Sequence, residues 1–205
     1  APIHAWRALG QLRAETAVEP LMGLLEEQKG DDWILEELPA VFGMIGRQVI
    51  RPLSAYLDQG PHELKPYVTA ITSLELIGKV HQDARSECIQ VLSDRLSRYG
   101  ENSPEINGFI IGSLVQLRSE ESIPTIQKAY ASGRVDGFLM SWEDVQKQFE
   151  PGGDLDKPSG EEKSDTSASH QHQGGSHPRH KSRRANVKRK QSERSRKINR
   201  RRKNR

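Results

Sequence analysis

The residues best suited to chemistry lie at the end of this 205-residue chain, where cations crowd together. Residues 179–205 contain 15 Lys and Arg and one acid, Glu193, which gives a formal net charge of +14. A polycation of this density releases counterions when it meets phosphates, so we predict binding to RNA or DNA with little sequence preference and steep salt dependence. The segment contains no Phe, Tyr or Trp that could stack on bases. The candidate phosphate contacts, expected to act as a set, are Lys188, Arg189, Lys190, Arg194, Arg196, Lys197, Arg200, Arg201, Arg202, Lys203 and Arg205.

Four histidines stand beside this basic segment. They fall within eleven residues, and the first two are spaced to reach one zinc, nickel or copper ion: His170, His172, His177 and His180. No rigid shell supports them, because residues 151–178 are rich in Gly, Ser, Asp, Glu and Gln and cannot bury enough apolar area to offset the entropy of ordering. We interpret 151–178 as a disordered linker and 179–205 as a disordered polybasic tail, with no metal site and no cofactor.

The remaining residues give little support to catalysis. Cys88 is the single cysteine, which excludes an intramolecular disulfide framework and a Cys-rich zinc site. We expect it to be half-buried as a small hydrophobe, because no His or Cys stands beside it to activate the thiol. The chain has no phosphate-binding or dinucleotide glycine pattern and no Gly-x-Ser-x-Gly elbow. We therefore predict no catalytic residue and a protein that is not an enzyme.

Charge and composition divide the chain at Glu150. Residues 1–150 carry a net charge of −8 and hold every Trp, Tyr and Phe, so they must form the core. No apolar run approaches the length of about 20 residues that spans a bilayer, and no signal-peptide pattern opens the chain. We expect a cytoplasmic protein with no membrane partner. Because the chain opens at Ala1 and runs directly into helix-like sequence, we also expect a fragment or a processed product.

An internal repeat organises residues 1–150. Apolar pairs three residues apart recur with first-member spacings of 33, 32 and 40 residues, as Leu9 and Leu12, Phe42 and Ile45, Leu74 and Ile77, and Leu114 and Leu117. Each pair is followed by an apolar triple with offsets i, i+3 and i+7: Val18, Leu21 and Leu25; Ile50, Leu53 and Leu57; Ile89, Leu92 and Leu96; Ile123, Ile126 and Tyr130. This pattern predicts two amphipathic helices in each of four units.

Three local features complete the expected helices. The third unit carries a longer connection, 79–85, which is either a longer loop or an extra helical turn. Pro39 is expected to start or kink the first helix of the second unit. Ser141 and Asp144 form a capping-box pattern before a short helix that ends near Phe149 and covers the last unit.

The pattern resembles HEAT repeats, specifically the short bacterial type named after phycobilisome lyase subunits. The resemblance rests on residues 8–12 and 17–25 and their echo at 49–53, while residues 32–42 look like a group of uncharacterised bacterial proteins of this type. It implies an all-α fold over 1–150: a right-handed α-solenoid of about four helical hairpins plus a capping helix. The fold says little about function, because HEAT-like proteins include scaffolds, lyases, hydroxylases and nucleic-acid enzymes.

The residues that HEAT-like enzymes need for their activities can be compared with those of this sequence. A hydroxylase-type di-iron centre needs several His-Glu pairs, and the sequence has one, His62-Glu63. A glycosylase-type repeat face needs cations, whereas residues 1–150 are acidic. A lyase-type enzyme subunit, with its site around Trp33 or the third-unit connection, remains the alternative function.

Two groups in the repeats are weaker candidates for partner binding. The acidic residues around Trp33 could dock a basic peptide, although we favour a solvated first helical turn: Asp31, Asp32, Glu36 and Glu37. Arg47 and Arg51 could grip a carboxylate of a partner, but we expect intramolecular ion pairs instead.

The sequence therefore predicts a non-catalytic adaptor or scaffold. Second helices line a shallow concave face that binds a protein partner, and the tail binds RNA or DNA. Two other interpretations of the tail stay open: a solubility tail, or a segment that folds back on the acidic repeats and competes with their partner.

Overall fold

The computed structural model describes residues 2–27, 32–59, 63–137 and 140–150, all within one compact unit, Ala1–Gly153. Every regular element of these residues is helical, which confirms the predicted all-α class. The α-helices are α1 (Pro2–Gln11), α2 (Val18–Glu27), α3 (Asp32–Ile45), α4 (Ile50–Asp58), α5 (Leu64–Val80), α6 (Arg85–Ser97), α7 (Pro104–Gln116), α8 (Ile123–Ala131) and α9 (Trp142–Phe149). Single 3-10 turns precede α2, α4 and α8: η1 (Glu15–Ala17), η2 (Arg47–Val49) and η3 (Glu120–Ser122).

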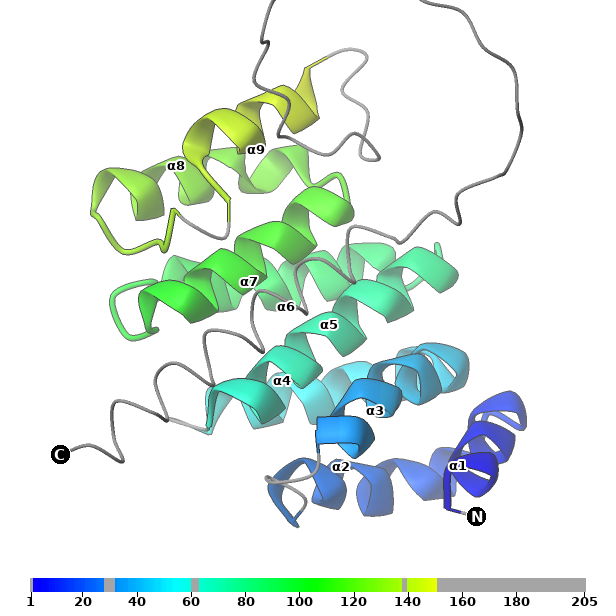
Figure 1. Cartoon of the computed structure of the whole chain (residues 1–205). Coiled ribbons are helices and arrows are strands. Elements are labelled where there is room, and N and C mark those ends of the chain that lie inside the picture. Colours follow the sequence, from blue (N-terminus) through cyan, green and yellow to red (C-terminus); the bar gives the residue numbers. More distant parts are fainter. Residues whose placement is uncertain (1, 28–31, 60–62, 138–139, 151–205) are drawn as a thin grey trace, which may run out of the picture. The chain divides into compact units, whose positions relative to one another are not determined.

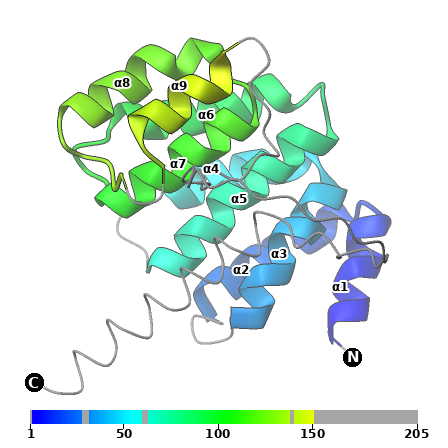
Figure 2. The same ribbon diagram turned by 45° about the horizontal axis from the view of Figure 1, so that its top comes forward.

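The helices pack in two rows. Helices α1, α3, α5 and α7 contact one another in that order, and α9 contacts α7. Helices α2, α4, α6 and α8 form the second row, and α5 joins the rows through contacts with α4 and α6. Figures 1 and 2 show α3, α5 and α7 lying side by side. Each first-row helix therefore packs against the first-row helices before and after it, and α6 also packs on its chain neighbours α5 and α7.

The predicted apolar faces account for most of the core. Phe42, Leu74 and Leu114 are fully buried, and so are Leu53 and Leu92 in the second row. Ile123 and Tyr130 of the fourth unit are half-buried. Leu12 is the exception, because it follows the end of α1 and is 77% exposed. The prediction that Leu12 completes a core pair is wrong.

The same backbone motif ends α1 and α7. Ala14 N donates to Leu9 O at 3.0 Å, and Ser119 N donates to Leu114 O at 3.0 Å. These bonds require a left-handed residue at the turn, which is Arg13 with φ of 50° and Arg118 with φ of 52°. The chain thus leaves both helices in the same conformation.

Pro39 lies inside α3 instead of starting it. A proline has no N–H and its ring pushes away the carbonyl four residues earlier, so Leu35 O loses its intrahelical donor. Thr69 of α5 replaces that donor: its Oγ1 lies 3.2 Å from Leu35 O and 3.0 Å from Lys65 O, with one proton for the two acceptors. A tertiary contact therefore makes the proline tolerable in the helix.

The third unit differs from the others through longer helices and a short turn. Helix α5 continues to Val80, and α6 begins at Arg85, so only His81–Ala84 separate them. The predicted extra helical turn is correct, and the alternative of a long loop is wrong.

The predicted capping helix is present as α9. Ser141 Oγ accepts from Asp144 N at 3.1 Å, and Asp144 Oδ2 accepts from Ser141 N at 3.2 Å, which confirms the capping box. Val145 is fully buried, and the ring of Trp142 lies 5.8 Å from that of Tyr130. Helix α9 thus covers the last helical pair.

Candidate interaction surfaces

The predicted nucleic-acid contacts lie outside the described residues. This holds for all eleven cations between Lys188 and Arg205 and for the four histidines from His170 to His180. Their roles stay predictions from the sequence.

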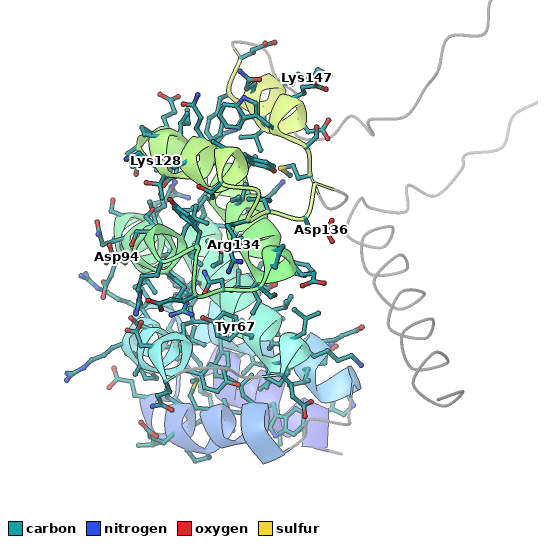
Figure 3. All side chains as sticks on the ribbon, turned by 90° about the vertical axis from the view of Figure 1, so that its left-hand side faces the viewer. Tyr67, Asp94, Lys128, Arg134, Asp136 and Lys147 are labelled. Carbon is teal, nitrogen blue, oxygen red and sulfur yellow. The ribbon has the colours of Figure 1, made fainter. Side chains whose placement is uncertain are left out.

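The second row offers the surface on which a protein partner is predicted to bind. Its exposed side chains mix charges and amides: Glu19, Arg51, Gln90, Asp94, Gln127 and Lys128. Figure 3 shows Asp94 and Lys128 along the same edge of the helical unit. Because acids and bases alternate there, this surface favours a partner with both charges over a uniformly charged one.

Polar side chains join neighbouring units beside this surface. Gln48 Nε2 donates to Glu15 Oε1 at 2.9 Å, Arg47 Nε donates to Glu87 Oε2 at 2.8 Å, and the hydroxyls of Ser93 and Ser122 lie 2.7 Å apart. The intramolecular pairing predicted for Arg47 is confirmed, and Arg51 stays exposed. The Arg47 and Glu87 side chains are both well exposed, so their ion pair contributes about 0.2–1 kcal/mol at most.

The acidic group near Trp33 is partly engaged within the chain. Arg7 Nη2 of α1 donates to Glu37 Oε2 of α3 at 2.7 Å. Glu36 is exposed on the same helix. Asp31 and the side chains of Asp32 and Trp33 lie outside the described residues. Glu37 thus links two first-row helices through an intramolecular ion pair.

A buried charge sits between the rows at α5 and α6. Arg95 is 8% exposed and its guanidinium carbon lies 5.8 Å from the centre of the Tyr67 ring. Tyr67 donates through its hydroxyl to Leu57 O at 2.9 Å. Burial raises the pKa of Tyr67, so the phenol stays neutral and keeps its donor. Arg95 also pairs with an exposed carboxylate in the turn after α6, since its Nη1 lies 3.7 Å from Glu101 Oε2.

Two asparagines tie the turn before α7 to the end of α8. Asn107 Nδ2 donates to Tyr99 O at 3.0 Å and to Arg134 O at 2.6 Å. Asn102 Nδ2 donates to Asn107 Oδ1 at 2.8 Å. Arg134 lies in the middle of the unit in Figure 3 and donates back to Asn102 O at 3.2 Å. Sequence reasoning missed this network, although Asn107 is a polar residue among apolar ones in its helix.

Glu75 is a second buried charge, within the first row. Its carboxylate accepts from Ser113 Oγ of α7 at 3.0 Å and pairs with Lys79 Nζ at 3.0 Å. Lys79 also donates to Gln116 Oε1 at 2.6 Å. The charge is thus compensated by neighbours and joins α5 to α7.

Cys88 is fully buried, and the prediction that it is half-buried is wrong. Burial, with a smaller contribution from Glu87, raises the pKa of its thiol to about 12. The thiol is therefore protonated at neutral pH and cannot act as a nucleophile. It contributes to packing only.

Among the residues that the structure describes, no group of three or more His, Cys, Asp or Glu is arranged to hold a metal ion. None of the described helices is long and apolar enough to span a membrane.

These features define, over the described part of the chain, an all-helical unit of packed helix pairs in which α9 covers the last pair. The chain belongs to the family described as proteins of unknown function, DUF1186, which matches residues 3–159. It is also similar to a protein of Chlamydia trachomatis serovar D named as uncharacterized: 29% identity over 154 residues, or 70% of this chain and 60% of the relative. The chain thus spans about 60% of the length of this relative. No solved structure matches the chain.

Proposed function

We propose that this protein is a non-catalytic adaptor. In this proposal the helix pairs form a right-handed solenoid of the HEAT type whose second row lines a shallow concave face for a protein partner. The polybasic tail, 179–205, binds RNA or DNA. The observation that carries the proposal is the opposition of charge along the chain: −8 in residues 1–150 and +14 in the tail. Such a division favours two binding partners of different kinds.

The helical unit supports the role of a scaffold in two ways. The thiol of Cys88 is buried and protonated. The buried carboxylate of Glu75 is compensated by contacts with neighbouring side chains. Surface side chains bridge successive units, as for Arg47 and Glu87. Contacts of this kind bring side chains of successive units together at the surface, where a partner would meet them. A cytoplasmic location without a membrane partner belongs to the same proposal.

A salt titration tests the tail. We compare the full chain with a chain that ends at Pro178, using fluorescence anisotropy with a duplex DNA and a structured RNA. The full chain is expected to bind both, with log Kd rising by several units per tenfold increase in salt, because each neutralised phosphate adds about 0.7–0.9 to the slope. The shortened chain is expected to lose binding while its circular dichroism spectrum keeps the helical signal.

A matched variant separates charge from length. The eleven candidate cations are replaced by Gln in the full chain, which keeps the length of the tail but lowers its formal net charge from +14 to +3. Equal affinity of this variant and the unaltered chain would contradict the proposal. Binding that persists in the chain ending at Pro178 would assign nucleic-acid recognition to the helical unit instead.

A further inference from the structure

Each second-row helix presents an outward stripe of two residues, and each stripe carries one charge. The two residues follow the first member of the apolar triple by one and five positions, so they are four apart and share a helical face. The apolar triple itself lies on the other side of the helix, toward the core. We call these residues the second-row stripes: Glu19 and Gly23 in α2, Arg51 and Ala55 in α4, Gln90 and Asp94 in α6, and Pro124 and Lys128 in α8.

The four charges of the second-row stripes are available to a partner. All of them are exposed, and in the described part of the chain none takes part in an ion pair: Glu19, Arg51, Asp94 and Lys128. The one polar contact of Asp94, from Gln90 Nε2 to its Oδ1 at 2.8 Å, comes from a neutral amide and leaves the carboxylate charge uncompensated. By contrast, the neighbouring Arg47 and Glu87 are already paired with each other.

The charges alternate in the order in which the helices are stacked. Helix α2 contacts α4, α4 contacts α6, and α6 contacts α8. From α2 to α8 the signs are therefore negative, positive, negative and positive. In the reverse direction every sign is exchanged. Two copies of this face in opposite order thus bring an acid against a base at all four helices, whereas a two-fold axis along the row would set each charge against itself.

Side-chain size is complementary in the same arrangement. The charged residue comes first in the stripes of α2 and α4, with a small residue after it, and second in the stripes of α6 and α8. A two-fold axis parallel to the helices sets the partner's Lys128 over Gly23 and the partner's Asp94 over Ala55. A Cβ on Gly23 would meet nothing within 4 Å, so the space above this glycine is open. Long side chains of one copy therefore meet the low positions of the other.

We propose that the second-row face binds a second copy of this chain, about a two-fold axis parallel to its helices. In this dimer Glu19 pairs with the partner's Lys128 and Arg51 pairs with the partner's Asp94, and each pair occurs twice. The inference rests on the proposed function, since it names the protein partner of the second row. The dimer carries two polybasic tails, which increases its avidity for one nucleic acid.

The size of the face is consistent with a weak dimer. The second-row helices contain 9 to 13 residues. Four helices of about 14–20 Å in length, set about 8–10 Å apart, cover about 600 Å². A standard interface buries about 800 Å² on each partner. We therefore expect a dimer that dissociates at high salt, because exposed ion pairs are screened by ions.

Sedimentation equilibrium of the full chain, free of nucleic acid, tests the dimer. Arg51→Glu and Asp94→Arg each replace two ion pairs by two like-charge contacts. Each substitution is expected to raise the Kd of the dimer at least about tenfold. The variant with both substitutions again has opposite charges in contact, so its Kd is expected to return to within about threefold of that of the unaltered chain.

Lys147→Glu is the matched control. It changes the formal charge of the chain by the same amount as Arg51→Glu, but Lys147 lies on α9, away from Asp94 in Figure 3. It is expected to leave the Kd of the dimer unchanged. A dimer held only by a basic tail on the acidic unit of another copy would respond to both substitutions alike, because both make the unit more acidic.

Three outcomes would overturn the proposal. The first is a chain that stays monomeric at about 100 μM protein in low salt. The second is a dimer that Arg51→Glu and Lys147→Glu weaken equally, and the third is a double variant that fails to recover the dimer. None of these measurements involves nucleic acid or another protein. A monomeric chain that still binds nucleic acid through its tail would therefore leave the adaptor proposal standing, with a different protein on the second row.

Discussion

The two ends of the helical unit differ in how they finish the same stack. At the C-terminal end α9 covers the last pair, with Val145 fully buried and Trp142 against Tyr130. At the N-terminal end Leu12, directly after α1, is 77% exposed. The contrast teaches that burial of a repeat residue depends on its neighbour unit: Leu12 and Leu117 share backbone geometry but not environment.

The largest expected effect separates these ends directly. Val145→Asp places a charge where α9 meets the rest of the unit, and it should lower the free energy of unfolding by about 3 kcal/mol or more. Leu12→Asp, directly after α1, should change the free energy of unfolding by less than about 0.5 kcal/mol, because the side chain is 77% exposed. Urea unfolding followed by circular dichroism measures both. Similar losses for the two variants would show that Leu12 is covered in solution.

The next largest change in stability is expected at glycine contacts between first-row helices. Gly78→Val should cost about 1–3 kcal/mol, because its side chain competes with Leu117 and Cys88 for the same space. Gly23→Ala in α2 is the matched control, since a Cβ there meets nothing within 4 Å. It should stabilise the protein by about 0.5–1 kcal/mol through helix propensity. Thermal unfolding of the two variants gives the sign of each change in stability. If Gly78→Val stabilised the protein, the close contact between Gly78 and Leu117 would not be what limits the side chain at position 78.

A smaller effect tests how firmly α9 is closed. Ser141→Ala removes the acceptor for Asp144 N and should destabilise α9 by about 1 kcal/mol. Hydrogen exchange is the suitable measurement, because the loss should appear in the amides of α9 before those of α5. Ser86→Ala, at an exposed position of α6, should leave both helices unchanged. Equal loosening of α5 and α9 would mean that the cap and the stack unfold as one.

The smallest effect is chemical. Because the pKa of Cys88 is raised to about 12 in the folded protein, its thiol should resist alkylation by iodoacetamide at pH 8, whereas urea-unfolded chain reacts. The raised pKa stabilises the folded state below the ordinary thiol pKa near 9, and this stabilisation is lost as the pH rises toward 12. Mass spectrometry of the labelled protein checks the first point. Rapid labelling of native chain would show that α5 and α6 open readily.

The sequence predicted the helices well where apolar spacing alone decides burial. Phe42, Leu53 and Leu92 were placed correctly because a helical face with period 3.6 needs no knowledge of its partner. The prediction that Leu12 is buried was wrong, because the burial of this position depends on whether a neighbouring helix covers it. Of the two roles predicted for Pro39, the start of a helix is wrong, because Pro39 lies inside α3. Its place there depends on the hydroxyl of Thr69, 30 residues away, which spacing in the sequence does not reveal.

The contacts between units were less accessible to sequence reasoning. Gly10, Gly43 and Gly78 recur at about the repeat interval. A glycine in a helix can either mark a position that lowers helix stability or allow a neighbouring helix to pack closely, and the sequence alone does not distinguish the two. Asn107 stood out only as a polar residue among apolar ones, and its two backbone acceptors come from separate turns. The binding residues of the tail carry no spacing that fixes a partner, so charge density alone predicted their role.

The hydroxyl that Thr69 lends to α3 bears on the order in which the chain assembles. While α5 is absent, Leu35 O has no donor from Pro39, and α3 is left with a gap in its hydrogen bonds at its middle. Helix α3 is therefore complete only after α5 has docked. The second helix pair is expected to gain its full protection together with the third, so the centre of the molecule folds as a cooperative block from which both ends extend.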